Sequence, residues 1–316
     1  MKDNDWFYSA KFTVSIYMKY GQAFEDFFCE IMKSSDDSFN KVKASGRIGD
    51  RSCDGFNAST GDYYLCYSPE NIKKTLTANN AVSKIQNDIS GIIKKWAGIV
   101  TINYVINDKF MGLSPQIHEL LSNLKSLNPS ISIELFSMEK LRKICLSLND
   151  LDKQRILGYC PDLTNSKAVA DFDTISKIIE YIEKNTTIGD YGDNLTVPDF
   201  SQKISFNNLT NKVADLLNNA RYHINKIEDF YNNMPAFNKD DLRNHLRGIY
   251  SEAVSTIDNA ESNYSDEVFF YILNKITYKP DSKAVTDNAL IILASFFESC
   301  DIFEEPVESI DEQVNA

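Results

Sequence analysis

Apolar residues recur at both helical and strand spacing along the first half of the chain, which predicts a mixed α/β domain. Between residues 22 and 32 they fall at i, i+3, i+4, i+7 and i+8, the spacing of one helix face. Further helices are predicted over residues 79–96, 115–127 and 137–148. β-Branched and aromatic runs predict strands over residues 39–43, 63–67, 99–106 and 131–136. Residues 12–18 alternate in polarity, which favours a strand, although a helix running on to Gln22 fits the same residues.

The second half of the chain shows helical patterns and no strong strand signal. Helices are predicted over residues 168–184, 208–231, 239–257, 265–278 and 283–303. Residues 186–201 are rich in Asn, Asp, Gly and Pro, which predicts a linker. The charged residues from Glu304 onward are all acidic, which favours disorder. The predicted parts are an α/β domain over residues 1–160, an all-α helical assembly domain over 161–303 and an acidic disordered tail over 304–316.

Most of the candidate functional residues lie between residues 46 and 69. A glycine-bracketed turn precedes two acids four residues apart, Asp50 and Asp54, and a polar turn then leads into an aromatic run. This order predicts a β-hairpin with carboxylates near one end. Glu25 lies at the edge of the apolar stripe of the preceding helix, so its side chain can point along the hairpin. A helix glutamate with a hairpin aspartate is a common way to hold a divalent cation, because hard cations prefer carboxylate oxygens.

Several short motifs in the first half of the chain resemble those of one family. They are Gly21-Gln22-Ala23-Phe24-Glu25, Gly46-Arg47-Ile48-Gly49-Asp50, Asp54-Gly55-Phe56, Tyr63-Tyr64, Tyr67-Ser68-Pro69 and Asn107-Asp108-Lys109. Together they resemble the Mrr-like branch of the PD-(D/E)XK restriction-endonuclease superfamily. They resemble more closely the nuclease-like proteins of bacterial ABC-three-component antiphage systems. The resemblance implies a restriction-endonuclease-like N-terminal domain and a metal-dependent DNA endonuclease that uses Mg²⁺ or Mn²⁺.

The resemblance also assigns roles to particular residues. Glu25 matches the helix acid and Asp54 the hairpin acid, which bind the metal ion in that superfamily, and Asp50 matches an accessory acid of the Gly-Asp turn. The next strand departs from the pattern, because Leu65 stands where a Glu or Gln ligand is expected and Tyr67 stands where a Lys is expected. Leucine cannot ligate a metal ion, and a phenol with an ordinary pKa near 10 carries no charge at pH 7.

A lysine elsewhere in space could replace the missing cation. The candidates are Lys41, Lys43, Lys73 and Lys74. Ordinary structural roles remain open for the acids, because Asp beside Gly often forms turns and Glu usually lies in solvent. His118 is interpreted as a surface or capping residue and Cys66 as a small buried apolar residue. The basic group of Arg243, His245 and Arg247 is interpreted as a solvated helix face.

Composition narrows the class of protein further. The chain has 316 residues and a formal net charge of -12, which does not favour general nucleic-acid binding but allows a local basic patch. Its six cysteines form no CxxC pair, and the start of the chain is charged, so we expect reduced thiols in a cytoplasmic protein without a membrane segment. The three histidines lie far in sequence from any cysteine pair, which argues against a zinc site.

The leading hypothesis is a nuclease-like component of a multiprotein bacterial antiphage defence system, which hydrolyses phosphodiesters with a metal ion if it is active. Its expected partners are an SMC-like or ABC-type ATPase and further subunits of the same system, with DNA as a further possible partner. The first alternative is a catalytically dead adaptor that binds a partner ATPase or DNA, and Leu65 favours it. The second alternative is an unrelated α/β scaffold in which the motif match is accidental.

Overall fold

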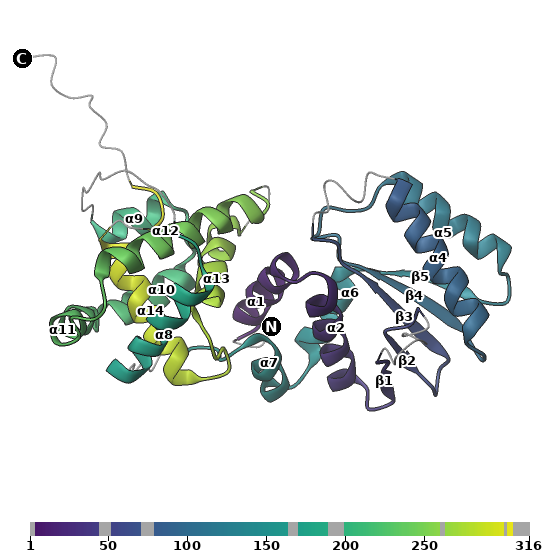
Figure 1. Ribbon diagram of the computed structural model, residues 1–316, viewed down its shortest axis with the longest axis horizontal. Helices are drawn as coiled ribbons and strands as arrows, with labels where there is room; N and C mark the ends of the chain where they lie inside the picture. The colour runs from purple at the N-terminus through teal and green to yellow at the C-terminus, as the bar shows by residue number, and fades with distance from the viewer. Residues whose placement is uncertain are drawn as a thin grey trace, which may run out of the picture. The chain divides into compact units, whose positions relative to one another are not determined.

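The computed structural model describes residues 4–43, 52–70, 79–163, 170–188, 199–259, 263–299 and 302–305. The expectation of a mixed α/β chain is confirmed, because the structure contains a five-stranded sheet and many helices (Figure 1). The chain forms two compact units, Ser15–Ile156 and the combination of Met1–Val14 with Leu157–Ala316. The predicted boundaries at residues 160 and 303 stay predictions.

The sheet of the first unit has the strand order β1-β2-β3-β4-β5. Its strands are β1 Phe39–Lys41, β2 Gly55–Asn57, β3 Asp62–Tyr67, β4 Thr101–Ile106 and β5 Ser132–Phe136. The first three strands pair antiparallel, and β3, β4 and β5 pair parallel. Parallel neighbours need a crossover connection, and helices α4 (Asn79–Lys95) and α5 (Pro115–Leu127) supply the two crossovers.

Helices cover both faces of this sheet (Figure 1). On one face, α4 and α5 pack against β3, β4 and β5 through a cluster of buried isoleucines and leucines that also contains Tyr104. On the other face lie α2 (Gly21–Ser35) and α6 (Met138–Ser147). The ring of Phe28 on α2 contacts Tyr64 on β3 and Phe136 on β5, each at 5.6 Å between ring centroids. A short helix that the sequence pattern did not predict, α7, follows at Asp150–Leu157.

The strand favoured for residues 12–18 is wrong, because these residues belong to helix α1, Asp5–Met18. All residues from Lys11 to Tyr17 are buried, so the helix has no polar face to reveal a period of 3.6. Two of the buried polar side chains form hydrogen bonds: the Lys11 ammonium donates to Asn274 at 2.7 Å, and the Thr13 hydroxyl donates to the Ser9 carbonyl at 3.1 Å. The alternation of polar and apolar residues in this run therefore does not indicate a strand.

The second unit contains the first part of α1 and seven further helices among its described residues. These are α8 Phe172–Asn185, α9 Phe200–Phe206, α10 Asn211–Arg221, α11 Asn225–Asn233, α12 Lys239–Thr256, α13 Tyr264–Ile276 and α14 Lys283–Glu298. Every residue of α14 from Val285 to Phe297 is buried, and this helix contacts α8, α10, α11 and α13. A helix that is buried on all sides lies in the centre of such a bundle.

One expectation for this unit is wrong, and another falls mostly outside the described residues. The single helix expected over residues 208–231 is wrong, because a turn at Tyr222–Ile224 separates α10 from α11. Tyr222 in this turn is 85% exposed, and both helices contact α14, so the apolar stripe continues across the turn without a continuous helix. Of the predicted tail, Glu304 donates its backbone N–H to Asn207 at 2.9 Å, whereas residues 306–316 lie outside the described part of the chain.

Asn107, which follows β4, is fully buried and connects three segments of the sheet unit. Its side-chain nitrogen lies 2.9 Å from the Ile16 carbonyl oxygen and 3.1 Å from that of Lys19, at the end of α1. The same nitrogen lies 3.0 Å from the Ser68 hydroxyl, and the Asn107 backbone N–H donates to the Tyr67 carbonyl at 2.9 Å. The ends of β3 and β4 and the turn into α2 are thereby held together.

This network predicts a large stability cost for Asn107→Leu. The variant keeps the volume but leaves buried carbonyl groups without a donor, so we expect the free energy of unfolding to fall by about 2–3 kcal/mol. Urea denaturation of the full chain measures it. The control is Asn128→Leu at the end of α5, which removes one partly buried hydrogen bond of 2.8 Å to Leu124 and costs about 1 kcal/mol. Equal losses in the two variants would contradict the bridging role of Asn107.

Candidate functional site

Helix α2 brings Glu25 to the end of β3. The helix buries Phe24, Phe27 and Phe28 on its sheet-facing side, and Glu25 lies at the margin of that stripe with a side chain that is 20% exposed. Gly21 begins the helix with a φ of 52°, a conformation that favours glycine, and its N–H donates to the Ser68 carbonyl at 2.8 Å. The first turn of α2 is thus fixed beside the residues that follow β3.

Asp54 directly precedes β2 and is fixed by its backbone and its side chain. Its N–H donates to the Tyr64 carbonyl at 3.0 Å, and its carbonyl accepts from Val42 at 2.9 Å. Its carboxylate accepts from the backbone N–H of Cys66 at 2.6 Å, across the hairpin. A turn-forming Asp would accept from its own chain two residues on, as Asp36 does from Ser38 at 2.8 Å. The local geometry of Asp54 is therefore not that of a turn former.

Glu25 and Asp54 line the same cavity, which has a volume of about 500 Å³. Its described lining residues come from the start of α2, the residues before β2, the end of β3 and one side of α4. They are Gly21, Gln22, Glu25, Ser52, Asp54, Leu65, Cys66, Tyr67, Ser68, Lys84 and Asp88. The third predicted acid, Asp50, lies outside the described residues, and its role stays a prediction.

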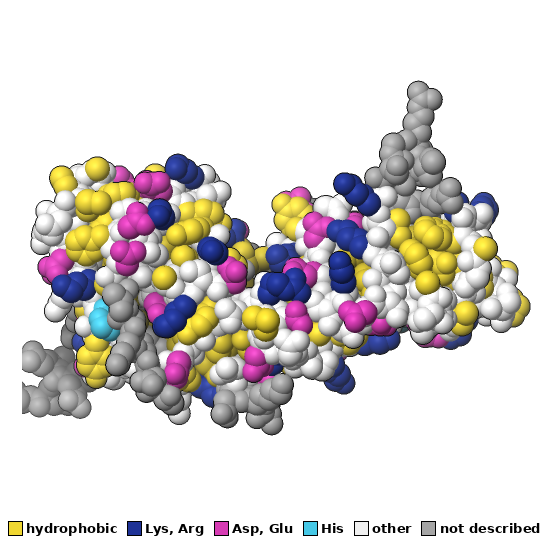
Figure 2. All heavy atoms as spheres, turned by 90° about the horizontal axis from the view of Figure 1, so that it is seen from below, with side chains coloured by type: hydrophobic (Ala, Val, Ile, Leu, Met, Phe, Trp, Pro, Cys, Tyr) yellow, Lys and Arg dark blue, Asp and Glu magenta, His cyan; other side chains and the backbone are white. Residues whose placement is uncertain are grey.

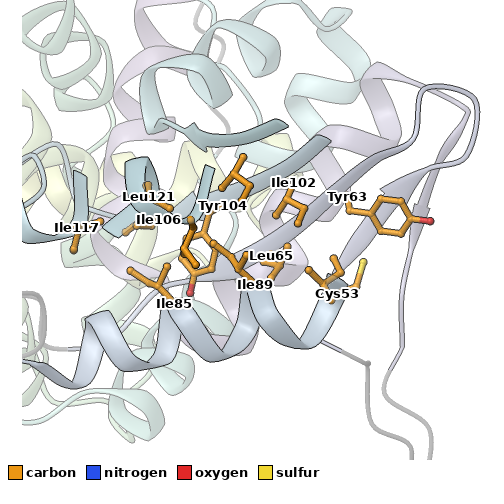
Figure 3. Packing of buried hydrophobic residues seen from close by; sticks show 13 residues of the cluster. Cys53, Tyr63, Leu65, Ile85, Ile89, Ile102, Tyr104, Ile106, Ile117 and Leu121 are labelled. Carbon is orange, nitrogen blue, oxygen red and sulfur yellow. The ribbon is translucent and has the colours of Figure 1, made fainter. Parts of the chain in front are cut away.

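Leu65 and Tyr67 border the cavity from β3 but do not supply a ligand or a cation. The Leu65 side chain is 3% exposed and belongs to the apolar cluster between the sheet and α4, where it lies next to Ile89 (Figure 3). Tyr67 is half-buried, and its burial raises the pKa of the phenol above its usual value, so the ring is neutral at pH 7. Uncharged side chains therefore border this side of the cavity, and they offer neither a metal ligand nor a cation.

Lys84 and Asp88 on α4 are functional candidates that the sequence interpretation missed. The Lys84 ammonium lies 2.9 Å from the Asp88 carboxylate and 5.7 Å from the centroid of the Tyr67 ring. The hydroxyl of Tyr104, which is buried in the sheet, donates to the same Asp88 carboxylate at 3.0 Å. The only sequence signal is a Lys–Asp pair at i, i+4 on a predicted helix, and most such pairs lie on solvated surfaces.

Of the four lysines proposed from the sequence, Lys41 and Lys43 are described, and neither is among the lining residues of the cavity. The Lys41 ammonium lies 3.9 Å from the Glu25 carboxylate and donates to Asp26, and that hydrogen bond raises the pKa of Lys41. Lys41 is absent from the described lining of the cavity, and Lys43 is exposed. Lys73 and Lys74 lie outside the residues that the structure describes.

The donor set of the cavity suits a hard divalent cation. Within the described ranges, no three His, Cys, Asp or Glu side chains gather closely enough to form a metal cluster. Mg²⁺ nevertheless commonly binds through one or two carboxylates and keeps several water molecules. Glu25 and Asp54 fit that requirement, since both residues carry a carboxylate and line a cavity that has room for water.

The remaining candidates are Cys66 and the basic group of residues 243–247, and we interpret both as structural. Cys66 was expected to be buried but is half-buried and lines the cavity, and desolvation raises the pKa of its thiol well above its usual value. The interpretation of residues 243–247 as a solvated face is wrong for two residues, because His245 is 7% and Arg247 is 8% exposed. The ring nitrogen Nδ1 of His245 lies 2.9 Å from the Thr186 hydroxyl, so the tertiary contacts of α12 bury these polar groups.

One comparison with known proteins bears on the second unit. Residues 173–304 match the family model for C-terminal domain 10 of the ABC-three component (ABC-3C) systems, and this range runs from α8 to the residues after α14. The match supports membership of the chain in such a system. Neither the search of curated proteins nor the search of solved structures gives a match. None of the described helices has the length and apolar character needed to cross a membrane.

The contacts of Asp54 predict different outcomes for two substitutions. Asp54→Ala removes the acceptor of the Cys66 N–H, and we expect the free energy of unfolding to fall by about 1–2 kcal/mol. Asp54→Asn keeps an acceptor oxygen of the same shape, so its cost should be smaller, at about 0.5 kcal/mol. Urea denaturation without divalent cations measures both values. If the two variants lose the same stability, the hydrogen bond to Cys66 does not hold Asp54 in place.

Proposed function

We propose that this chain is a nuclease-like component of an ABC-three-component antiphage system, and that its sheet unit is a restriction-endonuclease-like domain of PD-(D/E)XK type. The observation that carries the proposal is the convergence of Glu25 and Asp54, from a helix and a hairpin far apart in sequence, on one cavity at the end of β3. The match of residues 173–304 supports the placement in such a system. The reaction proposed is metal-dependent hydrolysis of a DNA phosphodiester bond.

We assign the residues of the cavity different roles in this reaction. Glu25 and Asp54 would hold a Mg²⁺ or Mn²⁺ ion, and Asp50 stays the proposed accessory acid. Such an ion supplies an activated water molecule and stabilises the charge that develops on the phosphate. The Cys66 N–H orients the Asp54 carboxylate toward its role as ligand. The turn at Gly21 and Ser68 holds the start of α2, and with it Glu25, at the same cavity.

Partner proteins belong to the proposal, because the second unit shows a helical bundle and a match to a C-terminal domain of a three-component system. We propose an SMC-like or ABC-type ATPase and further subunits of the same system as partners, and DNA as substrate.

On the face shown in Figure 2, basic side chains are interspersed with acidic and apolar ones and form no broad basic surface. Weak DNA capture by the chain alone would follow, since duplex affinity rests on neutralising phosphates. The five cysteines in the described part of the chain form no disulfide bond, and we propose a cytoplasmic location.

A catalytically dead adaptor remains the second candidate, and one observation favours it. Leu65 occupies the position of a metal ligand but packs in the apolar core beside α4 (Figure 3). A site that has lost one oxygen ligand binds Mg²⁺ less tightly, and the fold would then serve to bind a partner ATPase or DNA.

The first test of the proposal is plasmid nicking with Mg²⁺ or Mn²⁺, by the chain alone and by the assembled system. Glu25→Gln and Asp54→Asn remove one charged ligand each, so we expect both to lower the nicking rate by about 100-fold. The control Glu30→Gln lies on the same helix, where its carboxylate contacts Arg155 at 2.5 Å, and it should cut like the wild type. Efficient cutting that neither variant changes would refute the site. Protection of cells without any cutting would identify the adaptor.

A second test restores the missing ligand. Leu65→Gln places an amide oxygen at the border of the cavity, and we expect the affinity for Mn²⁺ to rise by about tenfold. Leu65→Met is the matched control, because it conserves volume and adds no oxygen ligand, and it should leave the affinity unchanged. Asp54→Asn in the Leu65→Gln background should remove the gain. Isothermal titration calorimetry measures all four proteins, and an equal affinity in Leu65→Gln and Leu65→Met would count against this ligand position.

A further inference from the structure

The charges around the cavity are unbalanced. Its described lining carries three carboxylates, Glu25, Asp54 and Asp88, and one ammonium, Lys84, which gives a net charge of three negative and one positive, or -2. A phosphodiester is itself an anion, so a cavity of this charge repels it. A divalent cation at Glu25 and Asp54 adds two positive charges and brings the total to zero. A phosphate can then enter, and it needs a cation that is free to contact it.

Lys84 meets the requirements for that contact. Its side chain is 50% exposed, and it borders the cavity beside the ring of Tyr67, within the distance at which a cation and an aromatic face attract. An ammonium group has three donors, so Lys84 can keep its hydrogen bond to Asp88 and still donate to a phosphate oxygen. Asp88 is itself held by the hydroxyl of the buried Tyr104, which limits the positions that Lys84 can take.

We propose that Lys84 is the phosphate-binding cation of this cavity, replacing from α4 the lysine that the motif lacks at Tyr67, and that it contacts nucleic acid only when a divalent cation occupies Glu25 and Asp54. This inference rests on the proposed function, because it uses the same cavity and the same class of substrate. It adds a residue outside the recognised motif and an order of binding, with the metal ion first and the phosphate second.

The experiment measures binding and not cutting. A fluorescein-labelled short DNA duplex is titrated with the full chain at several salt concentrations, in Ca²⁺ and in EDTA, and its anisotropy is followed. In Ca²⁺ at low salt, Lys84→Met should weaken binding by about tenfold and reduce the slope of log affinity against log salt by about one. Lys84→Arg should retain the wild-type slope. In EDTA, where binding is weak, Lys84→Met should differ from the wild type by less than about twofold.

The matched control is Lys125→Met on α5. Lys125 forms the same kind of pair, at 2.9 Å from Glu134, and is 54% exposed, but it does not line the cavity. It should bind the duplex like the wild type. Ca²⁺-dependent binding that Lys84→Met leaves unchanged overturns this inference and leaves the proposed function standing. An equal loss in Ca²⁺ and in EDTA overturns the order of binding, and a wild type without any Ca²⁺-dependent binding overturns the inference and the proposed metal site together.

Discussion

The hydrogen bonds of one buried carboxamide hold the candidate site together. Asn107 bridges the end of β4, the Ser68 hydroxyl after β3 and two carbonyl groups at the end of α1. The Ile16 carbonyl lies in the last turn of α1, where a helix leaves its carbonyls without a donor of its own, and Lys19 directly follows the helix. The hydrogen bond from the Gly21 N–H to the Ser68 carbonyl then fixes the first residue of α2 at the same junction. The position of Glu25 depends on this junction, because α2 is the element that carries it.

The cavity combines two kinds of surface with different physical constraints. The side formed by α2 and the residues before β2 presents carboxylates, and the Asp54 carboxylate is oriented by a backbone N–H. The side formed by β3 and α4 extends the apolar core, in which Leu65 is almost fully buried. A charged group at that buried position would lose its hydration, whereas the side chain of Lys84, which also lines the cavity, is 50% exposed. Helix α4 therefore contributes apolar residues to the core and charged residues to the cavity from different positions along the same helix.

Local sequence determined most of the elements that build this site. The apolar stripe of α2, the β-branched run of β4 and the aromatic strand β3 are visible as periodicities, because each element buries one face or both. The glycines and acids of the hairpin and the helix glutamate were enough to propose Glu25, Asp50 and Asp54 as candidates, while structural roles stayed open for all three. The pattern could not identify α1, since a helix that is buried on all sides shows no polar face.

Only the tertiary structure decided which other side chains share the cavity. Lys84 and Asp88 look in sequence like a surface pair, and nothing in their i, i+4 spacing indicates that they line a cavity. Their place at the cavity follows from the sheet order, because the crossover helix between β3 and β4 must pack across β3 and present one side to its end. Sequence periodicity specifies which face of a helix is apolar, but long-range strand pairing specifies what the polar edge of that helix meets.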